Sequence, residues 1–279
     1  MQVCYNIMVP VKGLNLKETE VIRTMSDTFL APEEITPKIE YWLLQHLEKA
    51  SAQGFVLGLS GGIDSAVVSV LLKRICPENM LAVIMPCHSL EHDTQDAYLL
   101  AQQFDIPVIS IDLSTVYDEF LSSLRSGSVN TSELAKANMK PRLRMTTLYS
   151  IAQSLNYLVC GTSNLAELAL GYFTKHGDSG VDILPLGDLL KREVNELARY
   201  LGVPGRIIEK PPSAGLWPGQ TDEEEMGLKY EDIDNYLSGS YVGASSIPDV
   251  IGDRIRRAEH KRKMAPICPL RTNKTFFKR

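Results

Sequence analysis

The fold is decided by one stretch near the start of the chain, which reads Phe55-Val56-Leu57-Gly58-Leu59-Ser60-Gly61-Gly62-Ile63-Asp64-Ser65. Its first residues are apolar and typical of a buried strand, a Ser-Gly-Gly turn follows, and residues 66–72 continue as an apolar run of helical length. A strand, a tight glycine turn and a helix in this order direct backbone N–H groups and a helix N-terminus at one point. The stretch therefore predicts a phosphate-binding loop.

The side chains of this loop suit a phosphate ligand. Gly61 and Gly62 allow a positive φ and a close approach of the backbone, and Ser60 and Ser65 offer hydroxyl donors. Asp64 offers a carboxylate for a metal bound to phosphate. The loop lacks both the Gly-Lys-Ser/Thr ending of the Walker loop and the spacing of the dinucleotide fingerprint. A plain glycine turn, with Asp64 as a first-turn charge, is the alternative, and the three polar side chains favour the phosphate interpretation.

The composition is that of an ordinary soluble globular protein. The 279 residues are 44% hydrophobic and 23% charged, enough for one large domain or two small ones. The net charge of -5 gives no global basic field for nucleic acid. The five cysteines are odd in number and form no Cys-x-x-Cys pair, which indicates a reducing compartment. No run reaches membrane-spanning length and Met1–Pro10 lacks a basic segment, so we expect a cytoplasmic protein with no membrane and no nucleic-acid partner.

Short apolar segments alternate with amphipathic ones along the chain. Strands are expected over 55–60, 81–85, 107–112 and 157–161. Helices are expected over 35–50, 64–75, 95–104, 115–125, 132–155 with an interruption at Pro141, 164–170, 189–201 and 230–237. Such continuous apolar strands between helices predict a parallel sheet covered on both faces. The expected fold class is therefore α/β, a Rossmann-like doubly wound parallel sheet with helices on both faces.

Polar residues follow the fourth expected strand, over 162–167. Ligands of parallel sheets bind beyond the carboxyl ends of the strands, so this segment and residues 60–65 should face the same crevice. Segment 171–182 is too rich in glycine and polar residues for a packed element, and we expect a functional loop or lid. Segment 210–220 contains three prolines and two glycines, which predicts a shaped loop.

Taken together, these segments resemble one family. Residues 60–65 match the pyrophosphate loop of the ATP pyrophosphatases, which have the adenine nucleotide alpha-hydrolase fold. The segments Gly161–Glu167, Gly171–Asp178 and Pro212–Trp217 narrow the resemblance to the NAD synthetases. The likeness covers roughly residues 35–263 in the order and spacing such a chain needs, which is far more specific than any one motif.

The resemblance implies a domain organisation and an oligomeric state. We expect an N-terminal extension over residues 1–31, a single α/β domain over 32–263 and a C-terminal tail over 264–279. A homodimer is implied, with the substrate site completed across the interface by the extension and the tail. Members of the family that use glutamine carry an extra nitrilase-like domain, and the chain has no room for such a domain before residue 55. The chain therefore resembles the short, ammonia-dependent form, and a separate glutaminase chain stays an open alternative.

The reaction implied by the resemblance is the last step of NAD biosynthesis. ATP and Mg²⁺ activate the nicotinate carboxylate of deamido-NAD as an adenylate, and pyrophosphate is released. Ammonia then attacks the adenylate to give NAD, and AMP leaves. ATP is thus a co-substrate, and Mg²⁺ is the implied metal.

The resemblance also assigns roles to single residues. The implied ATP-binding positions are Gly58, Leu59, Ser60, Gly61, Gly62, Ile63, Asp64, Ser65, Thr162, Lys191 and Ser213. Asp64 and Glu167 are the implied metal carboxylates, because two hard oxygen ligands with phosphate oxygens and waters suit Mg²⁺. Asp64 and Lys191 are the implied catalytic residues, and the lysine would meet ATP phosphate as a point charge.

A second set of positions is implied to bind deamido-NAD: Arg142, Lys175, Asp182, His260 and Lys261. The bidentate fork of an arginine suits a phosphate or a carboxylate. Arg144 lies two residues further along and competes with Arg142 for this role. Tyr172 and Phe173 are candidates for stacking on the pyridine ring.

Two other functions compete with this interpretation. The first is another pyrophosphate-loop enzyme that amidates or thiolates, although thiolases usually need paired cysteines or an RNA-binding basic surface, and the chain has neither. The second is a regulatory module that senses ATP without turnover, which would not need Asp64, Glu167 and Lys191 together. His88 and His92 superficially resemble a zinc pair, but the His-Glu-x-x-His order is missing.

Overall fold

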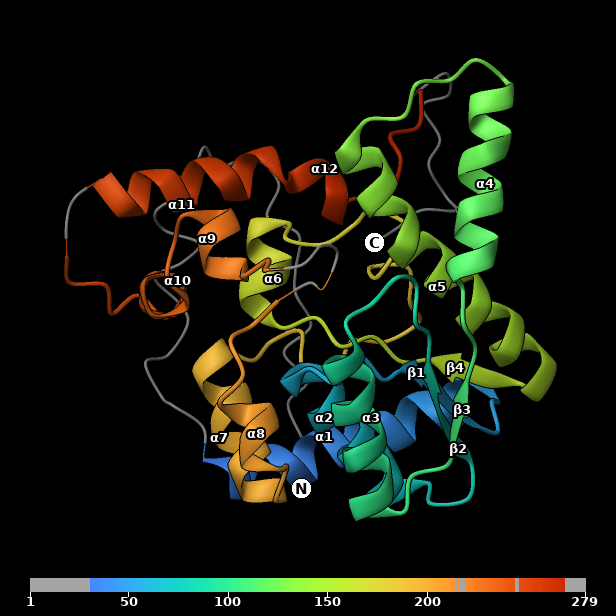
Figure 1. Ribbon diagram of the computed structural model, residues 1–279. Coiled ribbons are helices and arrows are strands. Elements are labelled where there is room, and N and C mark those ends of the chain that lie inside the picture. Colours follow the sequence, from blue (N-terminus) through green and yellow to red (C-terminus); the bar gives the residue numbers. More distant parts are fainter. Residues whose placement is uncertain (1–30, 214, 216–218, 244–245, 269–279) are drawn as a thin grey trace.

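The computed structural model describes residues 31–213, 215, 219–243 and 246–268. Within these residues, four parallel strands form the centre of the fold, in the order β3-β2-β1-β4 (Figure 1). Their bounds are β1 (Gly54–Gly58), β2 (Met80–Ile84), β3 (Val108–Ser110) and β4 (Tyr157–Val159). Phe55 of β1 is in register with Met80 on one side and with Leu158 on the other. The predicted parallel α/β sheet is confirmed.

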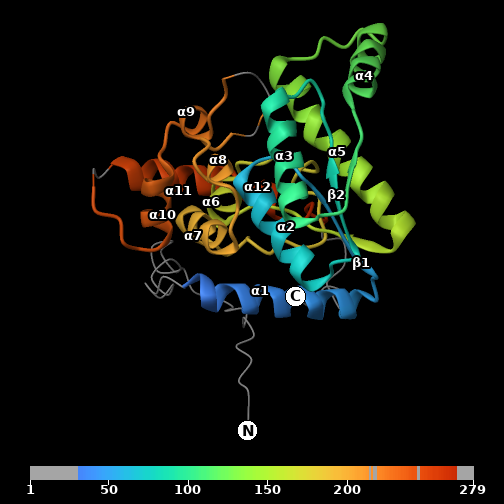
Figure 2. The same cartoon turned by 60° about the horizontal axis from the view of Figure 1, so that its bottom comes forward.

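Helices cover both faces of the sheet. One face carries α1 (Pro32–Ala50), α2 (Ile63–Ile75), α3 (Glu91–Phe104) and α7 (Lys191–Leu201). The other carries α4 (Ser114–Ser126) and α5 (Glu133–Leu155). Figure 2 shows α1 running along the outside of the first group. Helix α4 packs against α5, and its Tyr117 is buried in the core of the second face.

The alternation of side chains along β1 explains the two layers. Phe55 and Leu57 point to the face covered by α2 and α7, and Val56 points to the opposite face, against Leu148 and Ala152 of α5. The three β1 side chains are completely buried. Because successive residues of a strand face opposite sides, a strand buried on both faces reads as one continuous apolar run.

A third group of helices packs beyond the carboxyl edge of the sheet and has its own apolar cluster. Its members are α6 (Leu165–Leu170), α9 (Asp222–Met226), α10 (Tyr230–Leu237) and α11 (Ser246–Arg257). The short helices α8 (Gly205–Ile208) and α12 (Glu259–Arg262) follow α7 and α11. None of the helices over the described residues is long and apolar enough to cross a membrane.

Several expected boundaries were wrong. The expected interruption at Pro141 is absent, since α5 continues through it from Glu133 to Leu155. A proline removes one backbone donor, but Pro141 is buried, and a Cβ added to Gly177 would lie 3.1 Å from its side chain, so tertiary packing holds the helix together. Helix α3 begins at Glu91 rather than at residue 95, and α9, α11 and α12 were not foreseen.

The central strand should dominate stability. Leu57→Ala removes a completely buried side chain and leaves a cavity, so we expect a loss of about 3–5 kcal/mol in the free energy of unfolding. Leu44→Ala on α1 is the matched control, because Leu44 is 43% exposed; its cost should stay below about 1 kcal/mol. Urea unfolding measures both, and equal losses for the two variants would contradict the assigned core.

Candidate active site

The loop predicted to bind phosphate lies at the switch point of the sheet. Strand β1 has β2 on one side and β4 on the other, so the chain leaves β1 in one direction and returns to its other side. Ligands of open α/β sheets bind at this point, beyond the carboxyl ends of the strands. The loops after β1 and β4 therefore open onto the same edge.

Hydroxyl groups close the loop after β1 on itself. The Ser60 amide donates to Ser65 Oγ, and the Gly62 amide donates to Ser60 Oγ, each at 3.2 Å. Ser65 Oγ donates to the Gly62 carbonyl at 2.9 Å, so its proton is used, and Ser60 Oγ is the donor across the 3.0 Å between the two hydroxyls. The loop thus holds ordered amides and hydroxyls, the donors that a phosphate oxygen needs.

Only one of the two glycines needs a positive φ. Gly61 has a φ of +80°, and a Cβ there would lie 2.2 Å from the Asp93 carbonyl oxygen. The loop therefore packs directly against the first turn of α3. Gly62 has a φ of -91° as the N-cap of α2, so the expectation of a positive φ was wrong for Gly62.

Two carboxylates meet beside this loop. Asp64 lies in the first turn of α2 and Glu167 in the first turn of α6. Asn164, which is completely buried, joins them: its Nδ2 donates to Asp64 Oδ1 at 3.0 Å and to Glu167 Oε1 at 2.8 Å. Its Oδ1 accepts the Glu167 amide at 3.1 Å and caps α6. One neutral side chain therefore orients both acidic groups.

Lys191 brings a positive charge to this pair. Its Nζ lies 2.5 Å from Asp64 Oδ2 and 3.9 Å from Glu167 Oε1. The lysine side chain is only 4% exposed, whereas those of Asp64 and Glu167 are 18% and 17% exposed. Because water is largely excluded from the ammonium, its attraction to the carboxylates is stronger than that of a surface pair. The implied metal and catalytic residues thus lie in one cluster.

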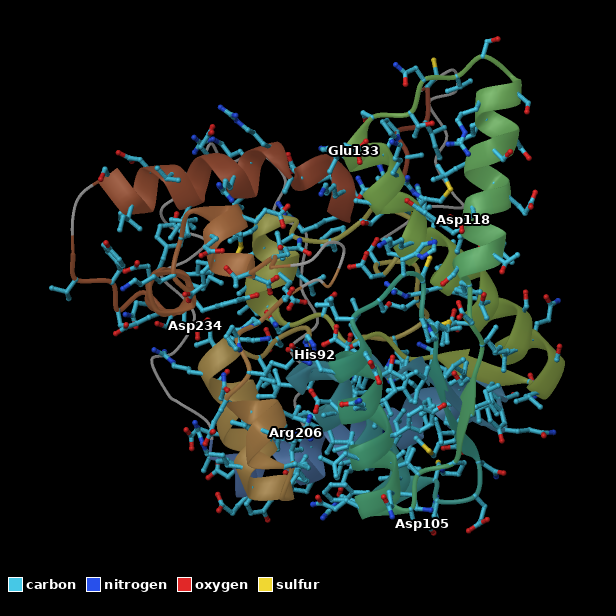
Figure 3. All side chains as sticks on the ribbon, in the orientation of Figure 1. His92, Asp105, Asp118, Glu133, Arg206 and Asp234 are labelled. Carbon is cyan, nitrogen blue, oxygen red and sulfur yellow. The ribbon has the colours of Figure 1, made fainter. Side chains whose placement is uncertain are left out.

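A buried carboxylate fixes the position of Lys191. Asp234 of α10 accepts the backbone amides of Lys191 and Arg192 at 3.1 Å and 2.8 Å. These amides begin α7 and have no partner within the helix, and a carboxylate at a helix N-terminus also complements the helix dipole. Figure 3 shows Asp234 beside the start of α7.

The charges in the cluster shift one another's protonation. Burial raises the pKa of Glu167 well above its usual range, Asp64 raises it further, and Lys191 lowers it. Burial lowers the pKa of Lys191, but Asp64 and Glu167 raise it more, so the pKa of Lys191 lies above its ordinary value. The lysine is therefore charged at neutral pH, and a further cation beside Glu167 would favour the ionised carboxylate.

The sequence did not single out the residues behind Lys191. Asp222, which is 5% exposed, lies 3.1 Å from the hydroxyl of Tyr172 and 3.0 Å from that of Tyr230. The Lys191 ammonium lies 5.2 Å from the centre of the Tyr230 ring, a cation–π contact. Burial raises the pKa of Asp222, and the two tyrosine hydroxyls lower it. The acidic run 222–225 is visible in the sequence, but nothing there separates its buried member from its exposed ones.

Three of the implied deamido-NAD positions form a chain of contacts. Arg142 of α5 donates from Nη2 to the Lys175 carbonyl at 3.3 Å. Lys175 donates from Nζ to the His260 carbonyl at 2.8 Å. Helix α5, the loop around Lys175 and α12 therefore meet at one place, with Arg142 and His260 exposed to solvent.

The other two implied positions fix the backbone of the 171–182 loop. Lys261 donates from Nζ to the Gly171 carbonyl at 2.7 Å and to the Phe173 carbonyl at 2.9 Å. Asp182 accepts the Val159 amide at 2.8 Å and so ties the end of the loop to β4. This segment contains no helix or strand, but Phe173 is buried, so the loop is packed as well as polar.

The remaining predicted positions lie around this edge. Thr162 is half-buried just after β4, and Ser213 is exposed, with its hydroxyl accepting the Gly215 amide at 3.1 Å. Trp217 lies outside the described residues. Arg144 donates to the Met85 carbonyl at 3.1 Å, so this competitor of Arg142 ties α5 to the end of β2.

His88 and His92 have separate carboxylate partners. His88 Nε2 lies 3.0 Å from Asp118 on α4, and His92 Nε2 lies 3.4 Å from Asp93 on α3. No group of three or more His, Cys, Asp or Glu residues suited to a metal occurs in the described part of the chain.

Comparison with known proteins establishes the family of the chain. The profile of the NAD synthase family matches residues 35–279. The chain belongs to the NAD synthase family. The NH(3)-dependent NAD(+) synthetase of Carboxydothermus hydrogenoformans is 50% identical over 236 residues, which cover 84% of this chain and 97% of that relative. The corresponding protein of Archaeoglobus fulgidus is 43% identical over 245 residues, or 86% and 98% of the two chains. The resemblance expected from the motifs is thereby confirmed.

Solved structures of NAD and NMN synthetases share the fold. The NMN synthetase of Francisella tularensis is 42% identical, has a TM-score of 0.82, and the match covers 86% of this chain and 99% of that one. The NH3-dependent NAD synthetase of Campylobacter jejuni is 32% identical, with a TM-score of 0.71 and coverage of 86% and 100%. The glutamine-dependent enzyme of Acinetobacter baumannii, at 22% identity and a TM-score of 0.62, shares the fold over 48% of its own length.

Substitution at Gly61 tests the packing of the loop. Gly61→Ala combines a left-handed backbone with a contact to the Asp93 carbonyl, and we expect a loss of about 2–4 kcal/mol in the free energy of unfolding. ATP affinity, measured by calorimetry, should fall at least about tenfold because the loop must move.

Gly202→Ala is the matched control for this substitution. Gly202 has a φ of +79°, and an added Cβ would have no atom within 4 Å. Only the backbone strain of about 1 kcal/mol should remain, with ATP affinity unchanged. Equal effects of the two substitutions on ATP affinity would show that the contact with α3 is unimportant.

Proposed function

We propose that this chain is an ammonia-dependent NAD synthetase, which amidates the nicotinate carboxylate of deamido-NAD and cleaves ATP to AMP and pyrophosphate. One observation carries the proposal: Asp64, Glu167 and Lys191 converge beside a serine–glycine loop at the switch point of the sheet, in a chain of the NAD synthase family. The NH(3)-dependent relatives match over almost their whole length, which supports the same activity.

The loop after β1 would hold the departing pyrophosphate. Cleavage between the α and β phosphates of ATP builds negative charge on the β-phosphate oxygens, and preorganised donors stabilise such charge most effectively. The amides of Ser60 and Gly62 are already ordered by the loop hydroxyls and would have to exchange these acceptors for phosphate oxygens, and the N-terminus of α2 adds a partial positive charge. Lys191 would supply the full positive charge that a Walker loop carries within its own sequence.

A magnesium ion is proposed at Asp64 and Glu167. The donor chemistry fits, because Mg²⁺ usually takes one or two carboxylates and completes its shell with substrate phosphates and waters. Asn164 already orients both carboxylates. Burial raises the pKa of Glu167 despite the nearby Lys191, so a metal ion there would favour the ionised carboxylate. When bound, the ion would neutralise phosphate charge. The Lys191 ammonium would then leave its ion pair with Asp64 and pair with a phosphate oxygen.

The opposite end of the site would bind the amide acceptor. Arg142, Lys175 and His260 cluster where α5 and α12 meet, and the guanidinium of Arg142 and the ammonium of Lys175 suit the phosphates of deamido-NAD. Lys261 and Asp182 would act by holding the loop that carries Lys175. Tyr172 and Phe173 on that loop are proposed to contact the pyridine ring, and Thr162 and Ser213 are proposed to contact ATP.

A second acceptor, nicotinate mononucleotide, is favoured by one specific observation. The solved NMN synthetase is 42% identical to this chain, and the match covers nearly all of that protein. Both acceptors present the same nicotinate carboxylate, so the adenylation site would serve either. Deamido-NAD contains an additional AMP group, which nicotinate mononucleotide lacks. Only deamido-NAD could therefore place this group against Arg142 and Lys175.

The remaining proposals concern the working form of the enzyme. We propose a homodimer in which a second copy covers α4 and the start of α5, where Val116, Phe120 and Leu134 are 51%, 47% and 64% exposed. Light scattering of the purified protein checks this directly, and a monomer would refute it.

The cysteines at 76, 87, 160 and 268 are free, which supports a reducing, cytoplasmic location. The single domain over residues 32–263 stays a prediction.

The activity can be tested with purified protein. With ATP, Mg²⁺, ammonium and deamido-NAD, we expect NAD, AMP and pyrophosphate in equal amounts, and glutamine instead of ammonium should support little turnover. Nicotinate mononucleotide should have a kcat/KM at least about tenfold lower than deamido-NAD. Folded protein that forms no NAD would contradict the proposal, and a preference for the mononucleotide would establish the second acceptor instead.

Removal of Asp64 tests the charged cluster. Asp64→Ala takes away a metal ligand and the partner of Lys191, so pyrophosphate release should fall by roughly a thousandfold. The matched control is Glu34→Ala, because Glu34 is, like Asp64, a carboxylate in the first turn of a helix, but it is exposed on α1. Its rate should stay within about twofold of the parent. Near-normal turnover of folded Asp64→Ala would show that the metal binds elsewhere.

A further inference from the structure

A second, partly buried ionic cluster lies on the outer side of the pyrophosphate loop. Lys210 contributes its ammonium from the segment after α8, and Asp93 and Asp96 contribute carboxylates from α3. Lys210 Nζ lies 2.5 Å from Asp93 Oδ1 and 3.0 Å from Asp96 Oδ2. Figure 3 shows Arg206 and His92 on the α8 and α3 sides of this region.

The same ammonium also reaches the loop itself. Lys210 Nζ donates to the Gly61 carbonyl at 3.4 Å. An ammonium has three donors, and here they face three acceptors on two elements. Gly61 packs against the Asp93 backbone without room for a Cβ. Lys210 therefore binds the loop and the part of α3 on which the loop rests.

The burial of the cluster distinguishes it from an ordinary surface ion pair. The side chains of Lys210, Asp93 and Asp96 are 20%, 22% and 4% exposed. Removing the cation would leave the nearly buried Asp96 carboxylate with Arg206, whose side chain is 55% exposed, as its ion-pair partner among the described residues. Exposed pairs contribute little, whereas a partly dehydrated pair fixes the elements that it joins.

Lys210 also begins the segment that carries Ser213. The Asp222 amide donates to the Pro212 carbonyl at 3.0 Å, which brings the far end of this segment back to its start. Ser213 lies directly after Pro212, three residues from Lys210. Anything that fixes Lys210 against Gly61 thus sets the position of this segment relative to the loop.

We propose that Lys210 is a positioning residue for ATP, which holds the pyrophosphate loop against α3 and joins it to the Ser213 segment through Asp93, Asp96 and the Gly61 carbonyl. The proposal deepens the proposed function and rests on it for the identity of the nucleotide. Lys210 acts through the backbone of the loop and not by touching phosphate, because its three donors are already engaged.

The test compares Lys210→Met with Arg206→Met in the full-length protein. Arg206 is the matched control, because its Nε pairs with the same Asp96 at 2.7 Å. It lies on α8, and within the described residues it makes no hydrogen bond to the loop like that of Lys210 to the Gly61 carbonyl. Amide hydrogen exchange of residues 58–65, ATP affinity by calorimetry and the kinetic constants are measured for both variants.

For Lys210→Met we expect exchange in residues 58–65 to rise at least about tenfold, since the loop loses its outer support. ATP affinity should fall at least about tenfold and kcat/KM for ATP about a hundredfold, while KM for the amide acceptor stays within about threefold. Arg206→Met should keep all four values within about threefold of the parent.

Two outcomes overturn the proposal. One is unchanged loop exchange and ATP affinity in Lys210→Met, and the other is an equal loss in Arg206→Met, which would assign the effect to the charge of Asp96 alone. If Lys210→Met does not fold, Asp93→Asn replaces it as the test variant. Its loop exchange should rise, and its ATP affinity and kcat/KM for ATP should fall, by about fivefold. Values equal to those of the parent would refute the positioning role of Lys210. Failure of the parent protein to form NAD would affect only the proposed function, because loop exchange and ATP binding need no amide acceptor.

Discussion

The ion pair between Lys191 and Asp64 is the interaction on which the carboxyl edge of the sheet depends. The two residues are 127 positions apart, yet their charged atoms lie 2.5 Å from each other, and the lysine is 4% exposed. A buried charge without its partner would cost several kcal/mol, so α2 and α7 must deliver both residues together. Asn164 orients the carboxylate side of the pair, and Asp234 fixes the first turn of α7 on the lysine side.

This constraint links stability to chemistry. The charges that satisfy one another in the free protein are those that a nucleotide with its metal ion would require, so binding replaces one set of ionic partners by another. The loop between Ser60 and Ser65 is held on its inner side by its own hydroxyls and on its outer side by α3 and Lys210. Donors that are ordered before the ligand arrives need little reorganisation when charge develops on the pyrophosphate.

Local patterns in the sequence were sufficient for the parallel sheet, the loop after β1 and the first-turn position of Lys191, because each depends on residues close together in the chain. Contacts between distant segments could not be read in this way. Lys210 resembles an exposed loop lysine until Asp93, 117 residues away, is placed beside it. Asp222 and Asp234 likewise sit in acidic runs typical of solvated helix faces. The continuous α5 through Pro141 shows tertiary packing overriding a local helix breaker.

The central claim is that this charged cluster serves a cleavage of ATP between the α and β phosphates that activates a carboxylate. The most direct test uses deamido-NAD with a heavy oxygen isotope in its nicotinate carboxylate, amidated by ammonia and analysed by mass spectrometry. If the carboxylate attacks the α-phosphate, one labelled oxygen must leave with AMP when ammonia displaces the adenylate, so we predict labelled AMP and unlabelled pyrophosphate. Unlabelled AMP, or the formation of ADP with labelled phosphate, would contradict the account.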